Sequence, residues 1–253
     1  MQEKIIGVEG ENTVNAVDVS PDSTRFATGT DKVASVWNVT SGERLLGPLK
    51  HHMFVTGIWF SPTTGNHIAT ACFGGSIQIF DSHTGDKLVT INTDMPRWIA
   101  VTPLAWSSDA QQIFAASHNT IKSFDTSTGS QLAESQILHH GNNDVASIAL
   151  AANNRFIATS AERSILFLDT STLTRIGPVI EDSKGIGSIA ISADSNHLVT
   201  GRGDGKIIIR DLSKILPNSY GPFRVRICAF MISAFQMIPI SSPMVINYIG
   251  TYS

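Results

Sequence analysis

Cysteine is scarce in this chain, and so are long apolar runs. Only Cys72 and Cys228 occur in 253 residues, which is too few for a disulfide framework and favours a reducing compartment. The N-terminal residues contain no apolar run of the length that a signal peptide needs. A membrane span needs about 18 continuous apolar residues, and the longest uncharged run is broken by Pro239 and Pro243. We therefore expect a cytoplasmic protein, with the nucleus as an alternative, and no membrane partner.

Basic residues are not in excess either. The chain has 18 Lys and Arg against 21 Asp and Glu, a net charge of −3 and an isoelectric point near 6.2. Nucleic-acid binding normally needs a clustered basic surface that displaces counterions from the phosphates. This composition predicts no nucleic-acid partner.

Motifs that carry chemistry are also missing. The histidine pairs at 51–52 and 139–140 have no cysteine pair or glutamate at a suitable spacing nearby, whereas zinc needs about four ligands in a tetrahedral array. No G-x-S-x-G nucleophile motif occurs. The glycine-rich residues 201–205 lead from one apolar run into another, so they predict a hairpin turn and not a phosphate-binding loop before a helix. We expect no catalytic residue, no metal and no cofactor.

Internal repetition, by contrast, runs through most of the chain. Five times, an apolar run is followed by a turn of small residues and by a second run that ends in a two-residue landmark. These landmarks are spaced 43, 44, 44 and 42 residues apart. A second phrase, which begins as VSPD at Val19, recurs upstream at spacings of 41, 46, 44 and 41 residues. Two landmarks with one period indicate a repeat array. The two-residue landmarks are Trp37-Asn38, Phe80-Asp81, Phe124-Asp125, Leu168-Asp169 and Arg210-Asp211.

The alternation within each unit has the period of a β-strand. In the first unit Val33, Ser35 and Trp37 fall on one face, and the residues between them fall on the other. Such a run, bounded by Gly, Asp, Ser and Thr, is typical of half-buried strands joined by a tight turn. About four strands in roughly 40–45 residues is the arrangement of a β-propeller blade.

The residues resemble the WD40 repeat family. In the first unit SPD is followed by ATGTD and VWN, which is similar to the family consensus, and SADSNHLVTGRGDGKIIIRD is similar to it in the last unit. The resemblance implies an all-β, WD40-type β-propeller with five recognisable four-stranded blades in residues 1–211. Seven blades are usual in the family, so we expect an incomplete or open ring, with a ring closed at five blades as the alternative.

The two ends of the chain carry separate expectations. Residues 4–8 form a short apolar run before the first unit, and the resemblance implies that they add the outer strand of the last blade and lock the ring; a frayed terminus is the alternative. Residues 212–253 contain no acidic residue and none of the repeat landmarks. We interpret them as a divergent apolar C-terminal tail, mis-specified or vestigial, with strands of a sixth blade or a membrane segment as alternatives.

The resemblance also assigns structural roles to residues of the repeat. In the family, an aspartate six residues before the tryptophan position joins a hydrogen-bonded group with a serine or threonine, a histidine and the tryptophan. Asp31 and Asp204 hold that place here and His51 falls where the histidine would lie, but no unit has all four members. The expected structural residues are Trp37, Phe80, Asp81, Phe124, Asp125, Leu168, Asp169, Asp211, Asp31, Asp204 and His51.

Candidate binding residues come from loops that the resemblance places on the narrow face of the propeller. Aromatic and arginine side chains dominate binding hot spots, because they bury a large area with little loss of entropy. For Phe54 and Trp98, packing between blades is the alternative. The candidate protein-binding residues are Met53, Phe54, Thr56, Phe73, Arg97, Trp98, Asp144 and Arg202.

These observations favour a non-enzymatic scaffold or adaptor that binds proteins or peptides. A propeller enzyme would need several charged side chains along the inner strands, and the five expected stretches hold only Asp18. A regulatory sensor propeller, detached from a larger NTPase switch protein, is the other alternative. An open ring would also expose a blade face, so self-association through an open blade is a further expectation.

Overall fold

A computed structural model describes residues 5–6, 13–93, 104–117, 119–136, 145–217 and 219–220 of the chain. Nineteen β-strands in this part form five separate antiparallel sheets, of which four have four strands and one has three. Strands that are consecutive in the sequence are neighbours in each sheet, which is the pattern of propeller blades. The predicted all-β repeat architecture is therefore confirmed.

Each repeat unit builds one blade. The first blade contains β1 (Ala16–Val19), β2 (Arg25–Gly29), β3 (Val33–Asn38) and β4 (Arg44–Lys50). The second contains β5 (Val55–Phe60), β6 (His67–Cys72), β7 (Ser76–Asp81) and β8 (Lys87–Asn92). The third contains β9 (Leu104–Trp106), β10 (Gln112–Ser117), β11 (Thr120–Asp125) and β12 (Gln131–Glu134). The fourth contains β13 (Ser147–Leu150), β14 (Phe156–Ala161), β15 (Ser164–Asp169) and β16 (Arg175–Glu181). The fifth contains β17 (Ile186–Ile191), β18 (His197–Arg202) and β19 (Ile207–Asp211).

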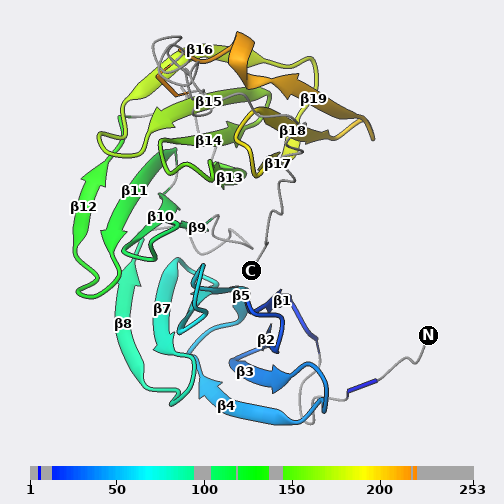
Figure 1. Cartoon of the computed structure of the whole chain (residues 1–253), viewed down its shortest axis with the longest axis vertical. Helices are drawn as coiled ribbons and strands as arrows, with labels where there is room; N and C mark the ends of the chain where they lie inside the picture. The colour runs from blue at the N-terminus through cyan, green and yellow to red at the C-terminus, as the bar shows by residue number, and fades with distance from the viewer. Residues whose placement is uncertain are drawn as a thin grey trace, which may run out of the picture.

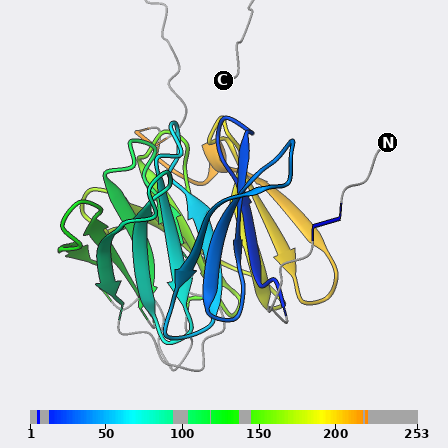
Figure 2. The same ribbon diagram turned by 90° about the horizontal axis from the view of Figure 1, so that it is seen from below.

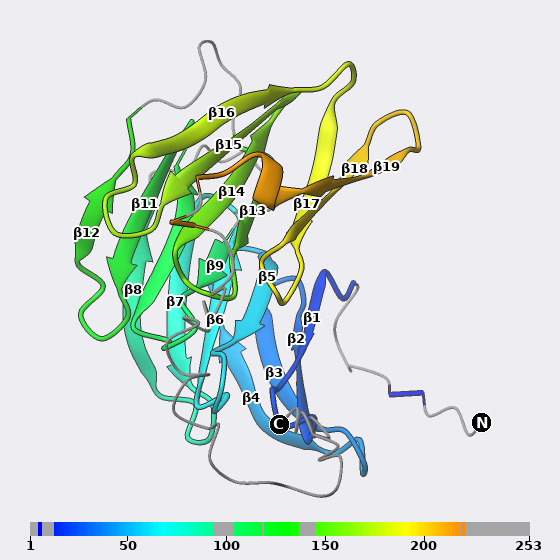
Figure 3. The same cartoon turned by 45° about the horizontal axis from the view of Figure 1, so that its top comes forward.

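The blades fan out around a common centre. Figure 1 shows the first strand of each blade nearest this centre, while β4, β8, β12 and β16 lie at the rim. Seen from below in Figure 2, the strands of neighbouring blades lie side by side. An opening separates the first blade from the fifth (Figures 1 and 3), so the described blades form an open arc.

The fifth blade differs from the expected four strands. Its order is β17-β18-β19, so the outer edge of β19 has no strand partner among the described residues. Of the expected locking strand at residues 4–8, only Ile5 and Ile6 are described; they belong to no strand, and Ile5 is 93% exposed. They lie beyond the first blade in Figure 1, across the opening from β19. The predicted locking strand is therefore wrong for these two residues, because the open arc keeps them away from β19; the other three residues lie outside the described part.

Apolar side chains fill the interface between each pair of successive blades. Strand alternation sends one set of side chains of a blade toward the preceding blade and the other set toward the following blade. We call the two sides the preceding-side face and the following-side face. Members of the four interface clusters, in chain order, are Val36 with Phe80, Ile79 with Phe124, Phe114 with Ile157, and Phe167 with Leu198.

The polar residue of each landmark caps the turn that follows it. The carboxylate of Asp81 accepts hydrogen bonds at 2.8 Å from the N–H groups of the second and third residues after it. Asn38, Asp125 and Asp169 accept the same pair of bonds, and Asp211 accepts one of them at 3.0 Å. Short Asp and Asn side chains suit this turn because they reach the backbone two residues ahead.

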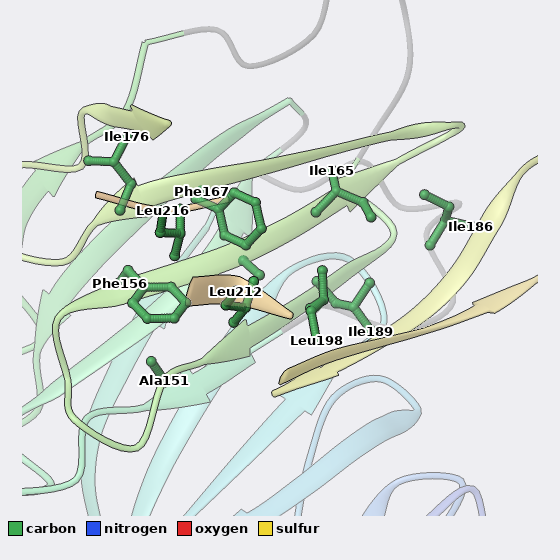
Figure 4. Packing of buried hydrophobic residues seen from close by; sticks show 11 residues of the cluster. Ala151, Phe156, Ile165, Phe167, Ile176, Ile186, Ile189, Leu198, Leu212 and Leu216 are labelled. Carbon is green, nitrogen blue, oxygen red and sulfur yellow. The ribbon is translucent and has the colours of Figure 1, made fainter. Parts of the chain in front are cut away.

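The chain after β19 turns back onto the fourth blade. A short 3-10 helix, η1 (Leu212–Lys214), follows at once. Leu212 and Leu216 are 3% and 7% exposed and join the cluster between the fourth and fifth blades (Figure 4). The hydroxyl of Tyr220 donates to Oδ2 of Asp169 at 2.8 Å. The described beginning of the expected tail thus packs on the propeller.

The core differs in composition between the two halves of the arc. The four tryptophans of the chain lie at positions 37, 59, 98 and 106, all in the first half of the sequence. The cluster between the fourth and fifth blades is built instead from Phe, Ile, Leu and Ala side chains.

Candidate functional site

Two apolar side chains stand in solvent on the loop between β4 and β5. Met53 is 39% exposed and Phe54 is 46% exposed. Nearly half of the Phe54 side chain is therefore accessible, so it does not pack inside an interface between blades.

Turns of two blades hold the backbone of this loop. On one side, the N–H of His51 donates to the carbonyl oxygen of Lys32, in the β2–β3 turn, at 2.8 Å. On the other, the N–H of Phe73, in the β6–β7 turn, donates to the carbonyl oxygen of Phe54 at 2.8 Å. The backbone of this loop is therefore held by hydrogen bonds to both blades, and its side chains project from that fixed backbone.

Phe73 extends the same apolar group on the second blade. It is half-buried, and its backbone bond to Phe54 places the two residues side by side. Thr56, the second residue of β5, is half-buried, and its hydroxyl donates to the carbonyl oxygen of Ala71 at 3.2 Å. We call Met53, Phe54 and Phe73 the loop patch; Thr56 is engaged within the sheet.

His51 anchors the start of this loop in the interface between the first two blades. It is 7% exposed. Its Nδ1 lies 2.9 Å from the carbonyl oxygen of Leu49, and its Nε2 lies 2.9 Å from Oγ1 of Thr70. The ring packs edge-on against Phe80, with 5.5 Å between the centroids. Burial lowers the pKa of His51 from its ordinary value, so the neutral ring is favoured: Nδ1–H donates to the Leu49 carbonyl and Nε2 accepts from the Thr70 hydroxyl.

Arg202 is engaged by two carboxylates, one from the loop between the fourth and fifth blades and one from its own blade. Its guanidinium lies 3.1 Å from Oδ1 of Asp182 and 2.7 Å from Oδ2 of Asp204, and only 11% of its side chain is exposed. Asp182 also binds Arg210 at 2.6 Å, and Arg210 donates to Oγ1 of Thr200 at 2.8 Å. The hydrogen bond from Arg210 is the main cause that holds the pKa of Asp182 below its ordinary value.

Sequence reasoning missed this ionic cluster. Its members come from the β16–β17 loop, from β18 and from β19, so no short motif unites them. The available signal was Arg210 itself, because a cation occupies the place of the tryptophan in the first unit. An arginine that is only 16% exposed needs an anionic partner, and Asp182 supplies it after the preceding outer strand.

Trp37 lies near the end of β3, at the landmark position of the first blade. It is 6% exposed, its Nε1–H donates to Oγ1 of Thr28 at 2.9 Å, and it stacks on Phe26 with 6.2 Å between the centroids. Because it alternates with Val36, which packs against the second blade, Trp37 belongs to the preceding-side face of the first blade. The corresponding side chains Phe80, Phe124 and Leu168 are 4%, 3% and 0% exposed.

The remaining predicted residues are placed as follows. The carbonyl oxygen of Asp31 lies 3.2 Å from the backbone nitrogen of Val55, so the β2–β3 turn also touches the start of β5. Arg97, Trp98 and Asp144 lie outside the described residues.

Burial raises the pKa of two further titratable groups, Cys72 and Asp18. Cys72 is 2% exposed, and burial raises the pKa of its thiol to about 11, so it stays protonated at neutral pH. Asp18 accepts a hydrogen bond from the N–H of Phe60 at 2.7 Å, and burial raises its pKa. Across the described ranges, no three His, Cys, Asp or Glu side chains come together in a way that could hold a metal ion. No helix of the described residues is long and apolar enough to cross a membrane.

The repeat matches a known family model. The WD40 model, described as "WD domain, G-beta repeat", matches residues 3–38 and 174–211. The first match ends at the Trp37-Asn38 landmark and the second at Arg210-Asp211, so both end at the same place in the repeat.

Curated relatives share this repeat. WD repeat-containing protein 1 of Gallus gallus is 27% identical over 213 residues, which cover 81% of this chain and 34% of that protein. The U3 small nucleolar RNA-associated protein 15 homolog of Xenopus tropicalis is 23% identical over 78% of this chain and 37% of its own length. The serine-threonine kinase receptor-associated protein of Gallus gallus is 24% identical over 75% of this chain and 52% of its own length. The chain thus spans between about a third and a half of the length of these relatives.

A solved structure shows the same fold. The computationally designed Ika8 protein aligns with a TM-score of 0.68 and 22% identity over 85% of this chain and 64% of that chain. The chain therefore carries repeats that match the WD40 family model, and it is similar to WD-repeat proteins in sequence and in the arrangement of its blades.

Proposed function

We propose that the chain is a non-enzymatic scaffold that binds a protein or peptide through the loop patch. One observation carries this proposal: Met53 and Phe54 are 39% and 46% exposed on a loop whose backbone is hydrogen-bonded to both adjoining blades. Large apolar side chains that are exposed next to one another on an ordered loop are a typical anchor for a partner.

The physical basis is the burial of these side chains on binding. Full burial of a Phe or Met side chain is worth roughly 1.5–3 kcal/mol, and about half of that remains available for Phe54 at its exposure of 46%. Because the loop is already ordered by its backbone bonds, binding would lose little conformational entropy there. A partner with an apolar side chain opposite Phe54 would fit this surface.

The relatives support a binding role of this class. They are WD-repeat and receptor-associated or RNA-associated proteins by name, and scaffolds are common among proteins that share this fold.

Selection from a peptide-display library on the purified chain, followed by calorimetry, tests the proposal. We expect Phe54→Ala to weaken the binding of the selected peptides about three- to tenfold, which corresponds to about 0.7–1.4 kcal/mol. Leu88→Ala is the matched control, because Leu88 is also an exposed apolar residue, at 49%, but lies on the rim strand β8. Peptides that bind Phe54→Ala as tightly as the original chain, or a library from which nothing is enriched, would contradict the proposal.

A further inference from the structure

Two isoleucines of β19 are exposed at positions that other blades bury. Ile207 and Ile209 are 73% and 68% exposed. Ile209 pairs with Val199 as Ile79 pairs with Ala69, so the third strands of the fifth and second blades are in the same register. The equivalent pairs are Ile77 and Ile79, both 0% exposed, Ala34 and Val36, at 0% and 1%, and Ile165 and Phe167, both 0%. Those pairs are buried by the following blade, whereas no other blade of the described residues covers the following-side face of β19.

The first blade likewise exposes apolar residues, but on its preceding-side face. Val17 and Val19 of β1 are 67% and 55% exposed. The equivalent side chains are buried by the preceding blade in the next two units: Ile58 and Phe60 are 3% and 5% exposed, and Leu104 and Trp106 are 7% and 9% exposed. The first blade therefore displays an uncovered preceding-side face, on which Phe26 stacks against Trp37.

These two faces are complementary to each other and not to themselves. Each of the four interfaces within the arc joins a following-side face to a preceding-side face. The arc ends with one uncovered face of each kind, and no hydrophobic cluster of the described residues joins the fifth blade to the first. A surface that fits β19 is therefore the surface that the first blade of another copy carries.

We propose that two copies of this chain associate head to tail, with the following-side face of the fifth blade of one copy stacked on the preceding-side face of the first blade of the other. The junction would repeat the interface that the chain already makes four times, with Ile207 and Ile209 of one copy packed against Val17 and Val19 of the other. This inference concerns the ends of the arc and is independent of the loop patch. Such an interface is heterologous, so it leaves one face of each kind free for a further copy or for closure.

Light scattering on the whole chain tests the association. A single copy has a mass of 27.2 kDa, and we expect a weight-average mass of at least twice that value, which falls on dilution. Val17→Lys and Ile209→Lys each place a charge on one of the two faces, and both sites are exposed, so circular dichroism should show an unchanged fold. Each variant alone should be monomeric, since every copy then lacks one half of the junction. Leu88→Lys, on the rim, is the matched control and should associate like the original chain.

Mixing the two variants is the decisive measurement. Val17→Lys keeps its fifth-blade face and Ile209→Lys keeps its first-blade face, so the mixture should form a dimer with one junction and no larger species. A mixture that stays monomeric, a single variant that still associates, or an original chain that is monomeric would each overturn the proposal. If association appeared only after removal of residues 221–253, the chain's own end, and not a second copy, would be the occupant of the uncovered face.

Discussion

At the residue scale, the residue directly after the outer strand ties one blade to the next in two places, after β4 and after β16. His51 follows β4 and reaches Thr70 of the second blade. Asp182 follows β16 and reaches Thr200 of the fifth blade through Arg210. The two threonines occupy the same place in their strands, since each pairs with the residue two before the landmark residue. A neutral imidazole in one place and an ion pair in the other thus connect an outer strand to the equivalent threonine of the next blade.

The histidine should make the stability of the chain dependent on pH. In the unfolded chain His51 takes up its proton at the ordinary pKa of 6.5, whereas burial lowers the pKa of the folded form. Between these two values the unfolded chain binds more protons, so the free energy of unfolding is highest above pH 6.5 and falls as the pH decreases below it. One proton limits the slope to about 1.4 kcal/mol per pH unit.

Urea unfolding at a series of pH values from neutral to mildly acidic checks this prediction. His51→Gln should flatten the pH dependence in that range and lower stability above it, because the hydrogen-bonded ring is lost. His52→Gln is the control, since His52 is the exposed neighbour in the same loop. The prediction fails if His51→Gln and the original chain lose stability in parallel as the pH falls.

At the element scale, the segment after β19 replaces an outer strand by a return to the fourth blade. Leu216 packs in the cluster between the fourth and fifth blades, and its Cδ2 lies 3.2 Å from where a Cβ on Gly177 of β16 would be. Gly177 has a φ of +66°, so both the backbone conformation and the close approach favour glycine there.

Leu216→Ala should therefore destabilise the last two blades. A leucine that is 7% exposed in a packed cluster leaves a cavity when it is shortened, at a cost of about 2–3 kcal/mol. Chemical denaturation followed by circular dichroism measures the loss. Leu45→Ala, at an exposed position of β4 (52%), should change stability by less than about 0.5 kcal/mol. A loss below about 1 kcal/mol for Leu216→Ala would show that the segment after β19 only rests on the surface.

The strands themselves could be predicted from the sequence, because period-two alternation and the recurrence of landmarks such as Phe80-Asp81 are local signals. The number of strands in the fifth blade could not. The outer strand of that blade would depend on a pairing between distant segments, and neither Ile5 nor Leu212 carries a local sign of its partner. The return of Leu216 to the fourth blade is a tertiary contact of the same kind.

The candidate site could be predicted only in part. Exposed loop residues such as Phe54 follow from the repeat, because the loop before an inner strand is located by the landmark that precedes it. The engagement of Arg202 could not be foreseen, since Asp182 lies 20 positions away in another element. An ion pair forms between side chains that are close in the folded chain, and the repeat pattern does not give the distance between Arg202 and Asp182.

At the scale of the whole molecule, the arc is a stack in which each blade contacts only its neighbours. The middle blades have a neighbour on both sides, whereas the fifth has one neighbour, three strands and an unpaired edge among the described residues. In such arrays stability is approximately a sum of unit and nearest-neighbour terms, so opening should begin at the ends.

Hydrogen exchange monitored by mass spectrometry should show this order. We expect amides of β17–β19 to exchange faster than those of β10–β11, which lie in a blade flanked on both sides. The measurement belongs in the Ile209→Lys background, where head-to-tail contacts cannot protect the end blade. Equal protection of β17–β19 and β10–β11 would indicate that the arc opens as one cooperative unit.

The uneven placement of tryptophan gives the protein a built-in optical asymmetry. The described tryptophans, Trp37, Trp59 and Trp106, lie on β3, β5 and β9, and the sequence has no tryptophan after position 106. No strand of the last two blades therefore carries a tryptophan. Far-ultraviolet dichroism, in contrast, sums over every strand. If the fifth blade melts before the others, the far-ultraviolet ellipticity will fall while the tryptophan emission spectrum is unchanged. The difference between the two melting temperatures will then measure how independently the fifth blade unfolds.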